Sequence, residues 1–122
     1  MAELTANEQE FLKYLKRKLF FKNYDIRFKV SLHDLYQERK DLSFTFGQNE
    51  DLLKDIIIDF ILSKDNKVVC GIEIVDEDDE LDLSKGRLLL IDSLFKQMNY
   101  KYFRVVDLTK LKQAAGIIAD KL

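Results

Sequence analysis

Two apolar runs, residues 56–62 and 68–75, are separated only by Ser63 and the link Lys64-Asp65-Asn66-Lys67. Asp and Asn tolerate left-handed backbone conformations, so this link predicts a hairpin turn between two buried strands. Each run carries one acid near its middle, Asp59 in the first and Glu73 in the second. A chain that folds around these runs must therefore accommodate two carboxylates inside its most apolar strands.

Burying an ionised carboxylate without a partner costs several kcal/mol or forces the group to take up a proton. Two such groups on adjacent strands suggest a divalent cation held between them. The alternative is a structural ion pair, in which an Arg, a Lys or backbone amides neutralise each acid. The residue types alone favour neither of these two interpretations.

The turn decides whether the two carboxylates can share a site. Residues directly opposite each other in an antiparallel pair share one face of the sheet. A two-residue Asp65-Asn66 turn would place Glu73 opposite Ile58, with the two acids on opposite faces. A shared site therefore needs a longer turn with an odd number of residues or a β-bulge near Gly71.

Length and composition predict one soluble domain over residues 1–122. The chain has four glycines and no proline, so no linker divides it. The single cysteine, Cys70, lies within an apolar strand and predicts a buried thiol in a reducing compartment. No segment has the composition of a signal peptide or a membrane span, so we expect a cytoplasmic protein without a membrane partner.

Charge is sorted along the chain although the net charge is only -2. Residues 1–29 carry a balance of +3, residues 34–82 a balance of -10 and residues 83–122 a balance of +5. Basic ends around an acidic middle could form a cationic rim about a cation-binding centre, as phosphodiester cleavage requires. Solvated helices rich in Lys and Arg would give the same sorting.

The remaining periodicity predicts helices and strands on either side of the hairpin. Thr5 and Glu8 form a capping box for a helix that extends to about Phe21. The other expected elements are a strand at 24–30 with Lys29 on its solvated face, a helical turn at 32–37, a loop at 39–51, a helix at 85–98, a strand at 102–106 and a helix at 109–121. The sequence thus predicts an α/β sandwich with a mixed central sheet, in which the strand at 102–106 is parallel to its neighbour in the hairpin.

The same residues resemble the PD-(D/E)XK nuclease superfamily, whose core order is α-β-β-β-α-β in a three-layer sandwich. Within it, the chain is similar to an uncharacterised bacterial domain family near the very-short-patch-repair type nucleases. The matching segments are Leu4-Thr5 with Glu8, Phe11 and Leu15, Phe28-Lys29-Val30 with Leu32 and Asp34, Ile58-Asp59-Phe60, Gly71-Ile72-Glu73-Ile74, Asp92 with Leu94-Phe95, and Phe103-Arg104-Val105.

The resemblance implies a Mg²⁺ or Mn²⁺ site formed by Asp59, Glu73 and the carbonyl of Ile74. Glu8 matches a position that often completes this site through water, although its capping role alone would explain it. The chain departs from the pattern at three positions, because Val75, Leu88 and Ile91 replace expected polar residues. A small-residue-His pair is also absent, and an acidic run at 76–82 takes its place.

Two lysines on the helix at 85–98 could supply the missing basic group. Lys85, Asp92 and Lys96 lie on one helical face, and the alternative for Asp92 and Lys96 is a surface pair. The expected function is a Mg²⁺-dependent DNA nuclease of low activity, with catalytic residues Asp59, Glu73, Lys85 and Lys96. Nucleic acid, DNA or alternatively RNA, would be bound by Lys13, Lys16, Arg17 and Arg87.

Two alternatives remain open at this level. One is a nuclease-like module that binds nucleic acid or a protein without cleaving. The other is a small homodimer formed through the C-terminal helix, whose Ala114-Ala115-Gly116 and Ala119 permit close helix packing or simply pack within the chain. The aromatic residues Phe11, Phe20, Tyr24, Phe28 and Phe103 fall on apolar stripes, which predicts core positions rather than base-stacking platforms.

Overall fold

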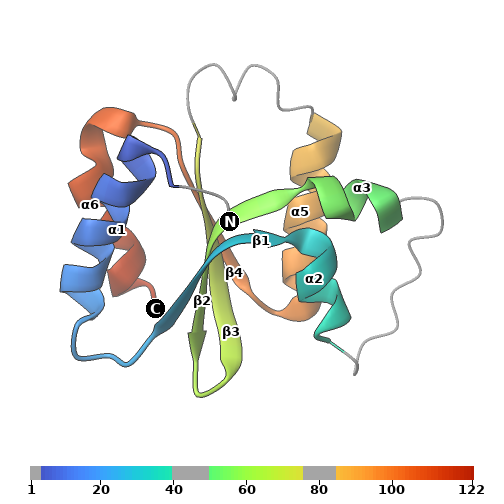
Figure 1. The fold of residues 1–122 in the computed structure, drawn as a ribbon, viewed down its shortest axis with the longest axis horizontal. Coiled ribbons are helices and arrows are strands. Elements are labelled where there is room, and N and C mark those ends of the chain that lie inside the picture. The colour runs from blue at the N-terminus through green and yellow to red at the C-terminus, as the bar shows by residue number, and fades with distance from the viewer. Residues whose placement is uncertain (1–3, 40–49, 76–84) are drawn as a thin grey trace.

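The computed structural model describes residues 4–39, 50–75 and 85–122 and shows an α/β fold with a four-stranded mixed sheet (Figure 1). The elements in chain order are α1 (Ala6–Leu19), β1 (Asp25–Ser31), α2 (Leu32–Gln37), α3 (Glu50–Asp55), β2 (Ile57–Lys64), β3 (Lys67–Ile74), α5 (Lys85–Met98), β4 (Lys101–Val105), the 3₁₀ helix η2 (Leu108–Lys110) and α6 (Leu111–Asp120).

The strands lie in the order β1-β2-β3-β4. The β1–β2 and β2–β3 pairs are antiparallel, and β3 pairs with β4 in parallel through the crossover that contains α5. The mixed sheet and the parallel last strand were predicted from the sequence, and both are confirmed. The strands β1 and β4 form the two edges of the sheet.

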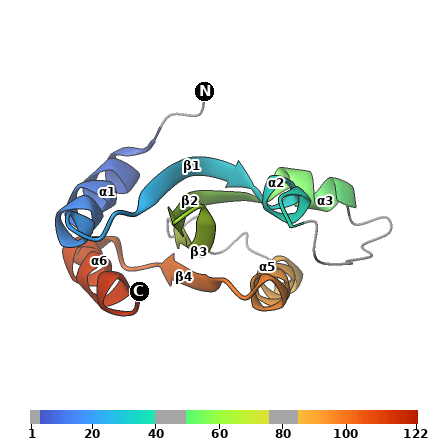
Figure 2. The same cartoon turned by 90° about the horizontal axis from the view of Figure 1, so that it is seen from below.

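Helices cover both faces of the sheet. Figures 1 and 2 show α1 and α6 on one face, and α2, α3 and α5 on the other. Two groups of buried side chains correspond to these layers. Phe11, Phe60 and Ile72 belong to the α1/α6 side, whereas Ile61 and Phe95 belong to the α5 side. Burial of apolar area in these two cores is the main stabilising term for such a fold.

The β2–β3 hairpin contains the bulge that the sequence required for a shared site. Its turn consists of Asp65 and Asn66, which have φ angles of 53° and 64°. Ser63 pairs with Val68 but Leu62 pairs with Cys70, so Val69 is the extra residue on β3. Beyond the bulge, β3 pairs with β2 in a register that places Leu62 opposite Cys70 and Phe60 opposite Ile72.

Several boundaries and positions differ from expectation. Helix α3, at Glu50–Asp55, was not predicted. Helix α1 ends at Leu19, two residues before the predicted end at Phe21. The side chain of Phe20, just after the helix, is 74% exposed. Phe28 is 43% exposed as well, so the prediction of core positions is wrong for Phe20 and Phe28. The last two residues of the loop predicted at 39–51 belong to α3. Residues 40–49 of that loop and the acidic run at 76–82 lie outside the described residues.

The small residues of α6 pack within the chain. Ala115 and Ala119 are buried in the core beside α1, and a Cβ atom on Gly116 would lie 3.7 Å from Lys18 Cε on α1. Internal packing was one of the two interpretations of these residues, and it accounts for their size. In the part of the chain that the structure describes, no helix is both long and apolar enough to cross a membrane.

Candidate functional site

In β1 and β2, the regular alternation of side chains between the two faces of the sheet is broken at the same level. On β2, Phe60 packs on the α1/α6 side, whereas Ile58 and Ile61 both pack on the α5 side. On β1, Ile26 and Val30 are four positions apart, a spacing that places residues on the same face of a regular strand, yet they pack on opposite sides of the sheet. Lys29 lies at this change and adopts a φ angle of 53°.

A positive φ is rare for a residue other than Gly, Asn or Asp, and it costs free energy that the surrounding structure must supply. Such strained positions gather at functional sites, so this level of the sheet is the natural place to look for one. The expectation that Lys29 lies on a solvated strand face is wrong, because its side chain is mostly buried beside Glu8 and Asp59.

One ammonium group connects two carboxylates at this level. Lys29 Nζ donates to Asp59 Oδ1 at 2.8 Å and also donates to Glu8 Oε2. Glu8 is buried, and its other oxygen accepts the Thr5 backbone N–H at 2.7 Å as part of the predicted capping box. The cluster Glu8–Lys29–Asp59 therefore joins α1, β1 and β2.

The second oxygen of Asp59 lies between two strands. Asp59 Oδ2 accepts the backbone N–H of Ile74 at 2.8 Å. The β2–β3 pairing extends in this direction only to Phe60 opposite Ile72, so a side chain takes over where the backbone pairing stops. This contact satisfies a backbone donor that would otherwise be lost at the opening of the ladder.

The pKa values of the two acids in the cluster are shifted in opposite directions. Burial and the neighbouring Glu8 carboxylate together raise the pKa of Asp59 to about 6, against the lowering effect of Lys29 and the Ile74 N–H. Burial acts in the same sense on Glu8, but hydrogen bonds with Asp59, Lys29 and Thr5 together lower its pKa. Lys29 keeps a raised pKa because both carboxylates favour its charged form against burial. The ionisation of each of the three groups therefore depends on the other two.

Glu73 has a different set of partners on the α5 side of the sheet. The Tyr102 hydroxyl donates to Glu73 Oε1 at 2.9 Å, and Arg87 Nη2 lies 3.7 Å from Glu73 Oε2. Burial raises the pKa of Glu73, while Arg87, Tyr102 and Arg104 oppose that rise. Within the described residues, the Nε and Nη2 atoms of Arg104 are buried without a hydrogen-bond partner.

The predicted ligand set is only partly brought together. Glu8 and Asp59 meet at Lys29, whereas Glu73 contacts Arg87 and Tyr102. Among residues 4–39, 50–75 and 85–122, no three Asp, Glu, His or Cys side chains form a ready group of metal ligands. Ile74, whose carbonyl was the predicted ligand, contributes its N–H to Asp59.

The other predicted site residues lie elsewhere. Lys96 is exposed and pairs with Asp92 at 3.3 Å, which is the surface pair that the sequence left open. Lys85 begins α5, but its side chain is outside the described part of the structure. Lys13, Lys16 and Arg17 are exposed on α1, and Arg87 is drawn toward Glu73.

Sequence reasoning missed two residues of the site, Lys29 and Tyr102. Lys29 carried one available signal, since it is the only charged residue in the run Phe28-Lys29-Val30 that aligned with the nuclease pattern. Tyr102 lies at the start of a short apolar strand, and nothing in its spacing points to Glu73. Comparisons with protein-family models, curated proteins and solved structures give no match to this chain.

Proposed function

We propose that this domain is a PD-(D/E)XK-type nuclease that hydrolyses DNA with Mg²⁺ or Mn²⁺. The observation that carries the proposal is the convergence of Glu8 and Asp59 on Lys29 at a strained position between β1 and β2. The order α1-β1-β2-β3-α5-β4 agrees with the α-β-β-β-α-β core of that superfamily and supports the assignment.

The donor set of the cluster suits a small divalent cation. Glu8 and Asp59 offer carboxylate oxygens, and Mg²⁺ binds through one or two carboxylates while it keeps several waters. Together with Lys29 these acids form a group of net charge -1, which a divalent cation could neutralise if the ammonium moved aside. A cation bound there would activate water and stabilise charge on the phosphate.

Lys29 takes the role of the basic residue that the sequence lacks at Val75. After it leaves the position between Glu8 and Asp59, its ammonium would remain beside the phosphate and offset the charge that develops in the transition state. Glu73 would stay bonded to Tyr102 and act by holding the end of β3, next to the Ile74 amide that orients Asp59.

A second function, a nucleic-acid-binding module without catalysis, is favoured by a specific observation. Each of the three acids already has partners within the chain, which are Lys29 for Glu8 and Asp59, and Arg87 with Tyr102 for Glu73. If these bonds persist in solution when Mg²⁺ is present, the fold would keep the acids for stability alone.

One experiment separates the two functions. Mg²⁺ or Mn²⁺ is titrated into wild type, Asp59→Ala and the surface control Asp92→Ala, and each sample is followed by thermal shift and by nicking of supercoiled plasmid. The nuclease proposal expects a metal-dependent rise in Tm and nicking in wild type and Asp92→Ala, with both lost in Asp59→Ala. No metal-dependent shift and no nicking in wild type would leave only the binding module.

A further inference from the structure

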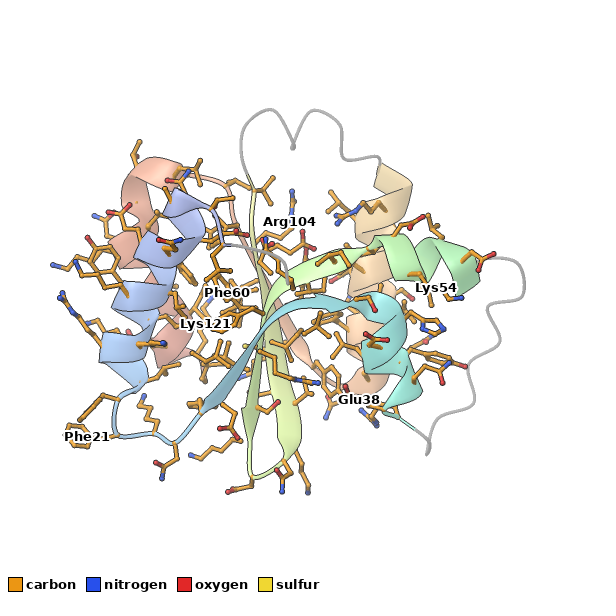
Figure 3. The ribbon with its side chains drawn as sticks, viewed as in Figure 1. Phe21, Glu38, Lys54, Phe60, Arg104 and Lys121 are labelled. Carbon is orange, nitrogen blue, oxygen red and sulfur yellow. The ribbon has the colours of Figure 1, made fainter. Side chains whose placement is uncertain are left out.

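A second surface lies where α1 ends and β1 begins, and the nuclease proposal does not use it. Phe20 and Phe21 are 74% and 89% exposed, and their rings meet edge to face with centroids 4.7 Å apart. Figure 3 shows Phe21 projecting outward from the turn between α1 and β1. We call the surface formed by Lys16, Phe20, Phe21, Tyr24 and Phe28 the aromatic corner.

Exposing two adjacent phenylalanine rings has no benefit for folding. Single exposed apolar residues are normal, but apolar side chains that gather on a surface usually mark a contact site. The two rings lie outside the core, since Phe20 follows the end of α1 and Leu19 is the last buried residue of that helix. The aromatic corner therefore needs an explanation based on a ligand.

The corner contains a hollow next to β1. It has a volume of about 620 Å³ and extends from Lys16, Leu19 and Phe20 past Tyr24 and Ile26 to Phe28. This volume falls in the range of small-ligand sites. Phe28 lines the hollow, and its ring packs edge to face against the buried Phe60 with centroids 5.9 Å apart. One wall of the hollow is therefore aromatic.

Charge near the corner is of one sign over the second half of α1 and the following turn. Residues 11–24 contain five basic residues and no acid, namely Lys13, Lys16, Arg17, Lys18 and Lys22. Lys64 of β2 adds another cation, with its Nζ 5.3 Å from the centroid of the Tyr24 ring. Among the described residues that line the hollow, Asp25 is the only acid. The ligand is therefore expected to be an anion with flat apolar faces.

The corner also leads directly to the candidate site. Phe28 lines the hollow and immediately precedes Lys29, which bonds Glu8 and Asp59. A polymer that lay along β1 from Phe20 to Phe28 would reach Lys29 with its next unit. Single-stranded nucleic acid has this form, because its bases have free faces and its phosphates carry the negative charge.

We propose that the aromatic corner binds single-stranded nucleic acid, with unpaired bases against Phe20, Phe21 and Phe28 and phosphates near Lys16 and Lys22. Bases inside a duplex are stacked on each other and cannot lie against these rings. The inference deepens the proposed function by naming a single strand as its substrate, and it rests on that function only for the step at Lys29.

Binding is measured by fluorescence anisotropy of a labelled oligo-dT strand in EDTA, over a series of salt concentrations. The double variant Phe20→Ala/Phe21→Ala should weaken binding by about tenfold or more, because stacking of one base is worth roughly 1–3 kcal/mol. Its salt dependence should not change, since no phosphate contact is lost. Lys16→Ala should instead reduce the slope of log affinity against log salt by about 0.7.

Leu89→Ala is the matched control, because Leu89 is 69% exposed on α5, on the opposite side of the sheet. It should bind like wild type, and the melting temperatures of all variants should stay close to that of wild type. The inference is overturned if the double variant binds as wild type does, or if duplex of the same sequence binds as tightly as the single strand.

The same variants also test two other occupants of the aromatic corner, a membrane surface and a second copy of the chain. Binding to phosphatidylserine vesicles that the oligonucleotide does not compete with would assign the corner to a membrane surface. A concentration-dependent dimer that the double variant abolishes would assign it to a second copy of the chain. Either result, without single-strand binding, overturns the inference.

The failure of this inference and that of the nuclease proposal give different results. Binding in EDTA that requires Phe20 and Phe21, without cleavage in Mg²⁺, supports the aromatic corner and rejects the nuclease. Cleavage that requires Asp59, is equal on single strands and duplex, and survives Phe20→Ala/Phe21→Ala supports the nuclease and rejects the corner.

Discussion

Lys29 Nζ lies 2.8 Å from Asp59 Oδ1 and bonds Glu8 through the same ammonium group. One cation thereby holds two buried carboxylates that come from a helix and a strand far apart in the sequence. The lysine backbone adopts a left-handed conformation to reach this place, with a φ of 53°. The arrangement compensates the charge of both buried carboxylates with one ammonium group.

Replacing Lys29 by Met should therefore destabilise the protein in the absence of divalent cations. Removing one partner of a buried ion pair costs roughly 3–5 kcal/mol, because the remaining charge is left without compensation. If Glu8 and Asp59 bind Mg²⁺, millimolar Mg²⁺ should restore much of the lost stability of Lys29→Met. Urea unfolding with and without Mg²⁺ measures both effects.

The control for this change is Lys96→Met, which removes a cation from an exposed pair with Asp92. Its free energy of unfolding should change by no more than about 0.5 kcal/mol, with or without Mg²⁺. A Lys29→Met protein that is as stable as wild type would contradict a structural role of the cluster. A destabilised Lys29→Met protein that Mg²⁺ does not rescue would argue against metal binding.

Asp59→Asn should become relatively more stable as the pH rises. Burial raises the pKa of Asp59 to about 6 in the fold, above its unfolded value of about 3.9. Between these two values the folded state of wild type holds more protons than the unfolded state, so wild type loses stability as pH increases. Asn has no such loss and still offers an oxygen to the Ile74 N–H.

The stability difference between Asp59→Asn and wild type should move in favour of Asn by about 1–3 kcal/mol from pH 4 to pH 7. Urea unfolding at both pH values measures this difference, and Asp92→Asn is the exposed control that should show no such trend. A difference that stays constant, or that moves against Asn as pH rises, would show that the ionised form of Asp59 is fully compensated.

Local signals explain why much of the fold could be predicted. The capping box at Thr5 and Glu8, the turn at Asp65-Asn66 and the apolar runs around it each act over a few residues. Helix α3 was missed because its six residues have only Leu52 and Leu53 as apolar members, which is too little for a helical period. Phe20 was misplaced because the apolar stripe continues one residue beyond the end of the helix.

The site could be predicted only in part because its partners are set by tertiary structure. Asp59 and Glu73 could be recognised as candidate site residues, because the sequence shows an acid within each apolar strand and burying a charge there costs free energy. Lys29 was assigned to a solvated face because the alternation of β1 was assumed to continue unbroken. The change of alternation arises jointly in β1 and β2, and neither strand shows it in its own sequence.

Tyr102→Phe should destabilise the protein, because the buried Glu73 carboxylate loses a hydrogen-bond donor. The hydroxyl donates to Glu73 Oε1 at 2.9 Å, and without it a buried acceptor loses a partner, which costs about 1–3 kcal/mol. Because the pKa of Glu73 is already raised by burial, the loss should be smaller at pH 4, where more of the carboxyl is protonated, than at pH 8. Thermal unfolding at the two pH values tests this.

Tyr14→Phe is the control for that experiment, because its hydroxyl makes only a long, exposed contact of 3.5 Å to Glu10. It should leave Tm unchanged at both pH values. An equal loss in Tyr102→Phe at pH 4 and pH 8 would mean that the hydroxyl acts through packing against Phe95 rather than through Glu73.

Gly71 and Gly116 should respond in opposite directions to the same added methyl group. A Cβ atom at Gly71 would lie 2.5 Å from Cε2 of Phe95 and 3.2 Å from Cγ2 of Ile58, so Gly71→Ala must push α5 away from the sheet. Such overpacking typically costs about 1–3 kcal/mol. At Gly116, within α6, the nearest side-chain atom is Lys18 Cε at 3.7 Å, so Gly116→Ala should stabilise by about 0.5–1 kcal/mol through helix propensity. Chemical unfolding of both variants measures the two signs, and a stabilised Gly71→Ala protein would contradict the close packing of Phe95 on β3.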